Sequence, residues 1–283
     1  MHVHDVGLLA CPETRSPLVF RGTNLELQVQ DGVLLCPSTG VAWGVEAGVP
    51  RLYRDGWRQG ADAGAADRLD RAPRFADPAF AAVTWLAGGL RAADLRQAVV
   101  EHLRLPALAG RPRARVLEVN VGTGGNIEPI LDNAPAGTHL ELWGTDLSMG
   151  ALAWARSRVA DNPEWFPRLS LFLADPHHLP FADGSFDRVL MVGRVDCLRD
   201  QPLALAELCR VCAADGELLL VDKQPDPARP PSALGRVVLR RVGAGAAAPQ
   251  LSPRRALPSG CRDVEEGQLS RAHYWLRARP PRR

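Results

Sequence analysis

The segment from Arg115 to Asn126 constrains the fold of this chain more than any other. An apolar run ends at Glu118, and a glycine-rich turn over residues 122–125 follows it. This order is typical of a buried parallel strand that opens into a helix. Glycines in such a turn let the backbone approach a ligand closely, and amides at the helix N-terminus add hydrogen-bond donors. The segment therefore predicts a ligand-binding turn in an α/β domain.

Strand-like and helix-like patterns alternate from this segment onward. Strands are expected at 115–120, 139–145, 169–174, 186–192 and 217–222, and helices at 125–133, 149–160 and 201–214. Gly216 is placed as a stop signal for the last of these helices. The alternation indicates a parallel sheet with helices on both faces.

An open parallel sheet binds its ligand at the carboxyl ends of its strands, so the residues that end each strand are candidates for a site. The second predicted strand ends at Asp146, 22 residues beyond Gly124, and the third ends at Asp175. The first acid is suited to accept hydrogen bonds from ribose hydroxyls. The second is placed to accept one from the exocyclic amine of adenine. Together with the glycine turn, the two acids predict an adenosine-shaped site.

The same residues resemble the class I S-adenosylmethionine (SAM)-dependent methyltransferases of the type 11, UbiE-like group. Residues 118–124 are similar to the family motif E/D-x-G-x-G-x-G, with Asn120 in place of its first glycine. Residues 175–187 are similar to D-A-x-x-L-P-F-x-D-x-S-F-D, and residues 207–222 to E-x-x-R-V-L-x-P-G-G-x-L-L-x-x-D. The resemblance covers about residues 112 to 279. It implies an α/β, Rossmann-like fold with a mostly parallel seven-stranded sheet, whose last two strands would be 261–267 and 271–279.

The resemblance also implies a cofactor, SAM, with S-adenosylhomocysteine as its product. The positions that match the SAM-binding residues of the family, or lie beside them, are Glu118, Asn120, Gly122, Thr123, Gly124, Asp146, Leu147, Asp175, Pro176 and Val192. Family members often carry two histidines after the fourth strand, where this chain has Asp196-Cys197, so their substrate is not carried over. Asp196 is the candidate base, and Arg194 is the candidate partner of a substrate carboxylate or phosphate.

Residues 1–54 predict a small β-rich module, with a hairpin signal at Asp31-Gly32. Residues 11–14 and 36–39 look like the paired cysteine motifs of a zinc-ribbon-like module that accompanies some methyltransferases. Each pair has a threonine as its second member, and two thiolates do not make a closed zinc site. We therefore expect a degenerate, metal-free module that docks substrate, forms a lid or serves as a structural appendage.

The remaining boundaries follow from composition. Residues 55–72 are polar and weakly patterned, so residues 55–110 are interpreted as a linker followed by N-terminal helices. Residues 111–283 would form the methyltransferase domain. A formal net charge of +2 over 283 residues gives no global field for nucleic acid or membrane. No secretory signal or apolar run of about 18 residues is present, so we expect a cytoplasmic protein with reduced cysteines.

Three functions compete at this point. The first is a methyltransferase with a small-molecule acceptor. The second is a methyltransferase of ribosomal or transfer RNA, because 12 arginines stand against 4 acids from Asp226 onward. Enzymes that methylate a ribosomal RNA guanine also resemble this order of a zinc ribbon followed by a methyltransferase. The third is a non-catalytic SAM-binding or scaffold protein, for which Asn120 and Asp196-Cys197 argue. The pattern predicts neither the acceptor atom nor the oligomeric state.

Overall fold

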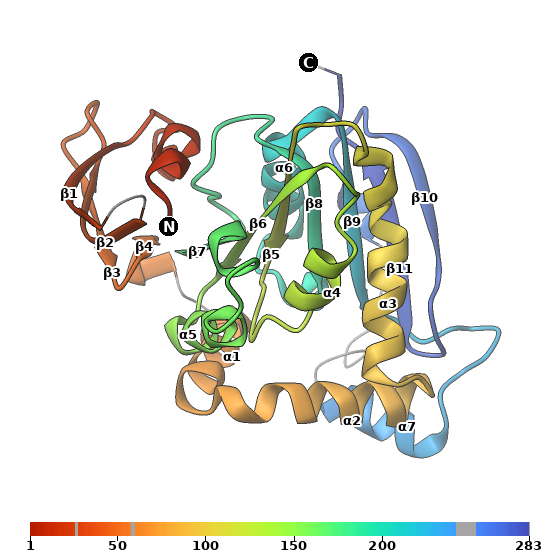
Figure 1. Ribbon diagram of the computed structural model, residues 1–283. Helices are drawn as coiled ribbons and strands as arrows, with labels where there is room; N and C mark the ends of the chain where they lie inside the picture. The colour runs from red at the N-terminus through yellow and green to blue at the C-terminus, as the bar shows by residue number, and fades with distance from the viewer. Residues whose placement is uncertain (26–27, 58–59, 242–252, 283) are drawn as a thin grey trace.

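The computed structural model describes residues 1–25, 28–57, 60–241 and 253–282. Its strands form one 11-stranded mixed sheet in the order β1-β2-β3-β4-β7-β6-β5-β8-β9-β11-β10 (Figure 1). The strands are β1 Val19–Leu25, β2 Gln28–Leu35, β3 Ala42–Glu46, β4 Val49–Leu52, β5 Arg113–Val119, β6 His139–Asp146, β7 Leu169–Ala174, β8 Phe186–Val192, β9 Cys212–Lys223, β10 Arg262–Gln268 and β11 His273–Arg279.

The helices surround this sheet, and short 3-10 turns link several of them. The α-helices are α1 Gly60–Arg71, α2 Ala76–Gly88, α3 Ala92–Leu103, α4 Ile127–Asp132, α5 Met149–Val159, α6 Gln201–Val211 and α7 Ala233–Arg241. The 3-10 helices are η1 Val3–Leu8, η2 Asp55–Trp57, η3 Pro73–Phe75, η4 Leu105–Leu108, η5 Phe166–Arg168, η6 Val195–Cys197 and η7 Pro253–Ala256. None of the described helices has the length and apolar character needed to cross a bilayer.

The predicted seven-stranded sheet is only part of the observed one. Strands β5 to β9 pair in parallel with their neighbours, whereas β11 runs antiparallel to both β9 and β10. The N-terminal strands then join the edge of this sheet, because β4 pairs in parallel with β7 through Arg51–Leu173 and Leu52–Ala174. The N-terminal strands therefore extend the sheet instead of packing apart from it.

The apolar side chains of the sheet divide between its two faces. Successive residues of β5 alternate, so that Val116 packs with α3, α4 and α5 while Leu117 packs with α6 on the other face. The second face contains a cluster of aromatic rings, in which Trp143 stacks on Phe172 at 5.1 Å and meets Phe181 and Phe186 edge-on. These buried strands explain the continuous apolar runs in the sequence.

Three local predictions were wrong. The presumed linker contains helix α1, which tertiary contacts stabilise: Asp70 accepts hydrogen bonds from Ser148 and from the backbone of Gly150. Residues 31–32 lie inside β2, opposite residues 22–23 of β1, and not at a hairpin turn. The residues that join these two strands, 26–27, lie outside the described part of the chain.

The third concerns Gly216, which does not stop a helix. Helix α6 ends at Val211, and the chain enters β9 at once because Cys212 pairs with Phe186. The register then shifts before Arg188. A Cβ atom at position 216 would lie 2.9 Å from the carbonyl oxygen of Asp187, so this glycine permits a close approach of two strands.

Candidate functional site

The glycine turn lies between β5 and α4, at the carboxyl edge of the sheet. Asn120, Gly122 and Gly124 all adopt left-handed conformations, with φ of 61°, 54° and 78°. Asparagine tolerates this region better than most residues, which explains how the turn survives without its first glycine. A Cβ at Gly124 would lie 2.6 Å from Cδ1 of Ile127 and 2.9 Å from Cβ of Ala155. This glycine therefore lets α5 pack directly against the turn.

Glu118 ends β5 and points an unpaired oxygen toward the turn. The side chain is 1% exposed, and its Oε1 accepts a hydrogen bond of 2.7 Å from Nδ2 of Asn126. Its Oε2 is buried and has no hydrogen-bond partner among the described residues. Burial raises the pKa of Glu118 to about 7, although Asn126 and Arg96 oppose the shift. The site thus offers a buried acceptor atom whose charge varies near neutral pH.

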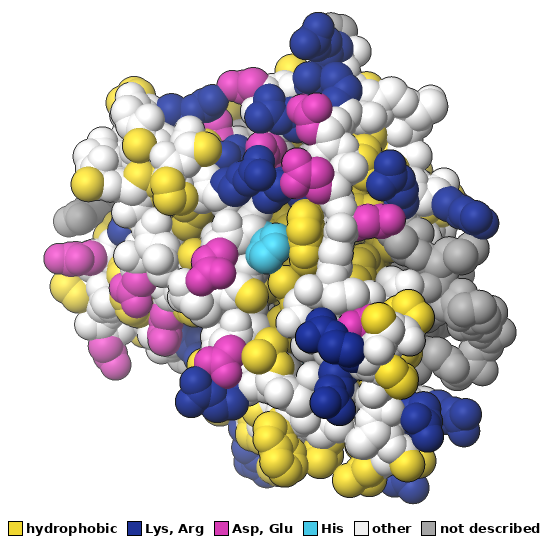
Figure 2. Space-filling view, turned by 90° about the vertical axis from the view of Figure 1, so that its right-hand side faces the viewer, with side chains coloured by type: hydrophobic (Ala, Val, Ile, Leu, Met, Phe, Trp, Pro, Cys, Tyr) yellow, Lys and Arg dark blue, Asp and Glu magenta, His cyan; other side chains and the backbone are white. Residues whose placement is uncertain are grey.

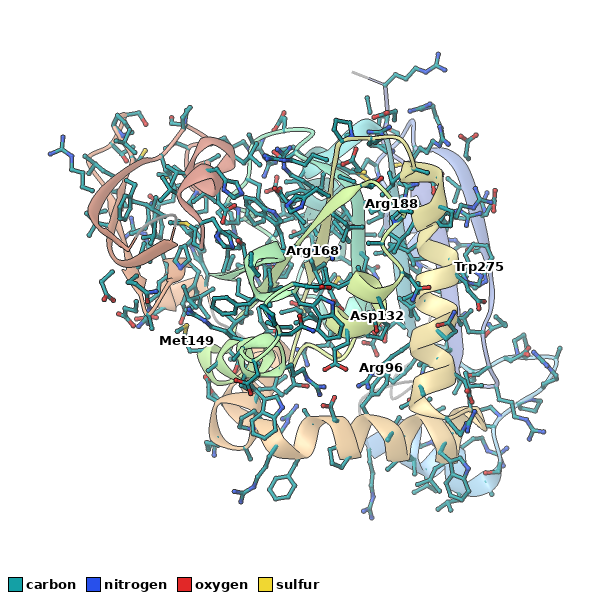
Figure 3. All side chains as sticks on the ribbon, viewed as in Figure 1. Arg96, Asp132, Met149, Arg168, Arg188 and Trp275 are labelled. Atoms are coloured by element: carbon teal, nitrogen blue, oxygen red, sulfur yellow. The ribbon has the colours of Figure 1, made fainter. Side chains whose placement is uncertain are left out.

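Charged residues from three helices close the turn. Oδ1 of Asp77 in α2 accepts hydrogen bonds from Arg96 of α3 at 2.9 Å and from the Thr123 hydroxyl at 3.3 Å. Its Oδ2 pairs with Arg158 of α5, which also donates to the carbonyl of Thr123 at 2.6 Å. Figure 3 places Arg96 in the space between α2 and α3. Glu118, the glycine turn, Val192 and side chains of α1, α2 and α3 line a small cavity of about 210 Å³.

Asp146 ends β6 and holds the turn in place. Its Oδ2 accepts a hydrogen bond of 2.9 Å from the amide of Gly122, and its Oδ1 accepts one of 3.0 Å from Ser148. Burial raises the pKa of Asp146 against these hydrogen bonds. Leu147 beside it is buried, and neither of these two residues is among those that line the cavities of this edge. Each carboxylate oxygen has a second lone pair, so these bonds leave capacity for ligand hydroxyls.

Asp175 ends β7 but faces protein groups. Its Oδ1 accepts hydrogen bonds from the backbone of His177, and its Oδ2 accepts one of 2.7 Å from Arg199. Burial opposes ionisation, yet the hydrogen bonds from His177 and Arg199 hold the pKa of Asp175 below its usual value. Arg199 also donates to the carbonyl of Trp57, so residues before the methyltransferase motif cover this acid. Asp175 and the buried Pro176 line neither the small cavity nor its larger neighbour.

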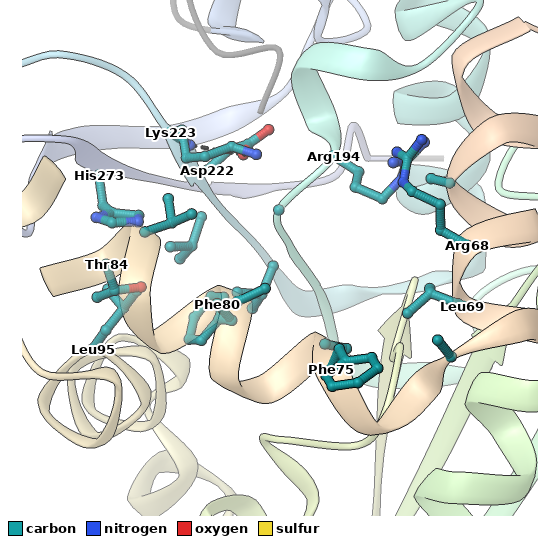
Figure 4. A pocket seen from close by; sticks show the side chains of 18 of the residues that line it. Arg68, Leu69, Phe75, Phe80, Thr84, Leu95, Arg194, Asp222, Lys223 and His273 are labelled. Carbon is teal, nitrogen blue, oxygen red and sulfur yellow. Dashed lines mark hydrogen bonds and ion pairs between the residues drawn. The ribbon is translucent and has the colours of Figure 1, made fainter. Parts of the chain in front are cut away.

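A second cavity of about 700 Å³ adjoins the first and lies between the ends of β8 and β9 and helices α1 and α2 (Figure 4). The two cavities share four lining residues, Leu69, Ala76, Phe80 and Val192. Arg194 lines the large cavity in a left-handed conformation with φ of 64°. Asp196 does not line it, and donates its backbone N–H to Oδ2 of Asp222 at 2.9 Å.

Asp222, the next-to-last residue of β9, lines the large cavity, whereas the residue predicted as the candidate base was Asp196. Burial raises the pKa of Asp222 to about 6, and Lys223 opposes the shift with its ammonium 3.9 Å away. The sequence carried one signal for this residue, its position at the end of the fifth strand. Arg96, Asp77 and Leu69 gave no such signal, because they reach the site from helices remote in sequence.

The paired cysteine motifs lie together in the N-terminal strands. Cys11 and Cys36 are buried, and the Cys36 thiol contacts the hydroxyls of Thr14 at 3.5 Å and Ser38 at 3.2 Å. Within the described ranges, no group of three or more His, Cys, Asp or Glu side chains could hold a metal ion. The threonine that replaces a cysteine at position 14 is thus a hydrogen-bond partner of the remaining thiol.

Comparisons with known proteins agree with this geometry. Residues 117–220 match a family model described as a methyltransferase domain. A ubiquinone/menaquinone biosynthesis C-methyltransferase from Laribacter hongkongensis is 30% identical over 122 residues, which are 43% of this chain and 48% of that protein. A demethylmenaquinone methyltransferase from Renibacterium salmoninarum is 33% identical over 121 residues, 43% of this chain and 46% of that protein. The chain thus spans about half the length of the curated relatives it matches.

Solved structures show the same fold at low sequence identity. Phosphoethanolamine N-methyltransferase 2 from Haemonchus contortus matches with a TM-score of 0.55 at 17% identity, over 77% of this chain and 60% of that chain. A putative SAM-dependent methyltransferase from Methanococcus maripaludis matches with a TM-score of 0.54 at 14% identity, over 80% of this chain and 96% of that chain. The [4+2]-cyclase SpnF matches with a TM-score of 0.52 at 15% identity, over 76% of this chain and 97% of that chain. Residues 117–220 therefore match a methyltransferase-domain family, and the chain has the Rossmann-like fold of the SAM-dependent methyltransferases.

Proposed function

We propose that this protein transfers a methyl group from SAM to a small-molecule acceptor. The observation that carries the proposal is the pair of adjoining cavities at the carboxyl edge of the sheet. The small one lies on the glycine turn and has both polar and apolar lining groups, and the large one is mostly apolar. Their common wall of Leu69, Ala76, Phe80 and Val192 would bring a donor and an acceptor together.

The residues of the small cavity fit the amino-acid part of SAM. The orphaned Oε2 of Glu118 suits an ammonium group, which would give this buried oxygen its missing donor. Arg96, whose guanidinium faces the same cavity, suits the carboxylate. Asp146 would take the ribose hydroxyls through the lone pairs that Gly122 and Ser148 leave open. Asp175 would not contact the cofactor directly. It would hold His177 and Arg199 in position on the adenine side of the site.

The chain's own part in the reaction is positioning and exclusion of water. Bound SAM supplies an electrophilic methyl group, so the protein needs to align a nucleophile and desolvate it. Leu69 of α1 and Phe80 of α2 line both cavities and exclude water where the two cavities meet. Asp222 lies where it could take a proton from an acceptor, since its pKa of about 6 leaves it ionised at neutral pH. The quinone methyltransferases matched by this chain act, by their names, on small molecules, which supports the same acceptor class here.

The RNA alternative has less support. On the face seen in Figure 2, basic and acidic side chains are interspersed, and no continuous basic field covers it. A scaffold function is favoured by one observation only, the enclosure of Asp175 by Arg199 and His177. In a catalytic protein, an adenine ring would have to bind beside Asp175 while Arg199 and His177 still enclose this acid.

Calorimetry with SAM and S-adenosylhomocysteine tests the proposal. We expect micromolar binding by the wild-type protein and loss of binding in Asp146→Ala, while Asp132→Ala, on the surface at the end of α4, serves as the matched control. Absence of binding by wild-type protein would refute both methyltransferase readings. Binding together with a salt-sensitive shift on RNA would move the assignment to the RNA alternative. Binding without methyl transfer to any acceptor would favour the scaffold.

A further inference from the structure

The large cavity is lined mainly by apolar side chains. Its walls are mainly alanine, leucine, valine and phenylalanine side chains from α1, α2, α3, β8 and the segment that joins α1 to α2, namely Ala65, Leu69, Ala72, Phe75, Ala76, Ala79, Phe80, Val83, Leu95 and Val192. A volume of about 700 Å³ is in the range of sites for drug-sized ligands. Such a lining favours an acceptor with a substantial apolar body.

The charged lining residues are not balanced. Four basic side chains line the cavity, Arg68, Arg71, Arg194 and Lys223, and Asp222 is the only acid among the described lining residues. Lys223 and Asp222 lie at one end, with Nζ and Oδ1 3.9 Å apart, so they offset each other. Figure 4 shows Arg68 and Arg194 at the opposite end of the cavity, across the apolar floor. That end therefore carries excess positive charge.

Several neighbours interact with the charged residues of the cavity. Arg194 lies near Asp146 and stabilises the charge of that acid, so part of its field is used there. Arg71 donates from Nε to the carbonyl oxygen of Asp67, a neutral group. His273 adds no charge at the other end, because burial and then Lys223 lower its pKa to about 4. Arg68 and Arg194 therefore line one end of the cavity, and the one acid among the described lining residues lies at the other.

A buried hydroxyl supplies an independent sign that a ligand belongs here. Thr84 of α2 lines the cavity and is fully buried, and its Oγ1 has no hydrogen-bond partner among the described residues. Figure 4 shows this hydroxyl beside the cavity, on the side of His273 and away from Arg68. A buried hydroxyl without a partner is unfavourable, and a polar group on a bound molecule would satisfy it.

We propose that the acceptor is an amphipathic anion, with a carboxylate or phosphate at the Arg68–Arg194 end and an apolar body along Phe80 and Val83. A neutral polar group on that body would meet Thr84. That this anion is a methyl acceptor rests on the proposed function. The binding of the anion to the large cavity does not require SAM.

The test is calorimetry of the full chain at pH 7.5 with four probes of equal chain length: decanoate, decyl phosphate, decan-1-ol and decylamine. We expect decanoate or decyl phosphate to bind at least tenfold more tightly than decan-1-ol, with decylamine weakest. The better of the two anions identifies the acid group. The preference should shrink as salt is raised, because Arg68 is solvent-exposed.

Variants locate the effect. Arg68→Gln should weaken decanoate binding about fivefold and leave decan-1-ol binding unchanged, since only the charge at the cavity mouth is removed. Arg91→Gln is the matched control, because Arg91 is 80% exposed and pairs with Asp94 outside the cavity. Val83→Trp and, at the rim, Ala79→Phe should weaken all four probes by filling the cavity.

Equal binding of alcohol and anion, equal effects of the two arginine variants, or no binding of any probe would overturn the proposal. Titration with S-adenosylhomocysteine separates its failure from that of the methyltransferase assignment. Cofactor binding without anion preference would refute only the acceptor class. Anion preference without cofactor binding would refute the methyltransferase and leave the amphipathic site standing.

Discussion

Replacement of Glu118 by glutamine should make the ligand-free protein more stable and the cofactor site weaker. The wild-type carboxyl is fully buried, and its pKa rises from 4.5 to about 7. A shift of about 2.5 units corresponds to about 3 kcal/mol of unfavourable free energy when the group must be ionised. Glutamine keeps an oxygen for Asn126 and carries no charge, so it removes this cost.

The pH dependence gives the sign of the effect. The folded state binds more protons than the unfolded state between pH 4.5 and about 7, so the contribution of Glu118 to stability falls as pH rises through that interval. Glu118→Gln should therefore raise the free energy of unfolding by about 3 kcal/mol at pH 8, and by less than about 1 kcal/mol at pH 5. The measurement is urea denaturation of both proteins, without cofactor, across this range.

Exposed Glu101→Gln is the matched control and should leave the unfolding free energy nearly unchanged at both pH values. The same glutamine at position 118 should reduce affinity for S-adenosylhomocysteine at least tenfold, because it removes the charge offered to an ammonium group. Wild-type affinity should increase from pH 6 to pH 8 as Glu118 ionises. A Glu118→Gln protein that is no more stable than wild type at pH 8, or equally stabilised at pH 5, would refute the reasoning.

Substitutions at four positions test the turn and its supports by denaturant unfolding. Gly124→Ala should cost more than about 2 kcal/mol, because its Cβ would overlap the next helix, whereas Gly122→Ala faces open space and should cost about 1 kcal/mol; equal losses would contradict the packing argument. Asn120→Ala should lose about 1 kcal/mol and Asn120→Gly should lose none, since φ is 61° there; a loss in both would point to the side chain instead. Asp70→Ala should cost about 1 kcal/mol, by freeing the amide of Gly150 at the start of α5, and unchanged stability would argue against this contact.

The order of strands and helices after residue 112 was predictable because buried parallel strands leave long apolar runs. The glycine turn, Glu118 and Asp146 were identified for a similar local reason. Glycines that favour left-handed conformations and acids that end strands are each recognisable from a short stretch of sequence. In the structure, the hydrogen bond from Gly122 to Asp146 joins the turn to the acid of the next strand. The conformation of Asn120 followed from its position in the turn.

Features that depend on distant contacts were not predictable. Helix α1 has weak patterning and forms against Ser148 and Gly150, which lie about 80 residues later. The joining of β4 to β7 depends on an open sheet edge, which no local pattern reports. No local pattern reports that Asp222 lines the large cavity and Asp196 does not, because the placement of both residues depends on the pairing of β8 with β9.

The sequence by itself determined that a glycine-rich turn follows a buried parallel strand, because glycine conformation and strand burial are local properties. Only the tertiary structure decided what surrounds that turn. Arg96, Asp77 and Leu69 reach it from helices that precede the motif, and Arg199 and Trp57 cover Asp175. The charge and shape of the cavities arise from side chains that meet only when those helices pack on the carboxyl edge of the sheet. The ligand chemistry that these cavities can support therefore depends on packing and not on any single motif.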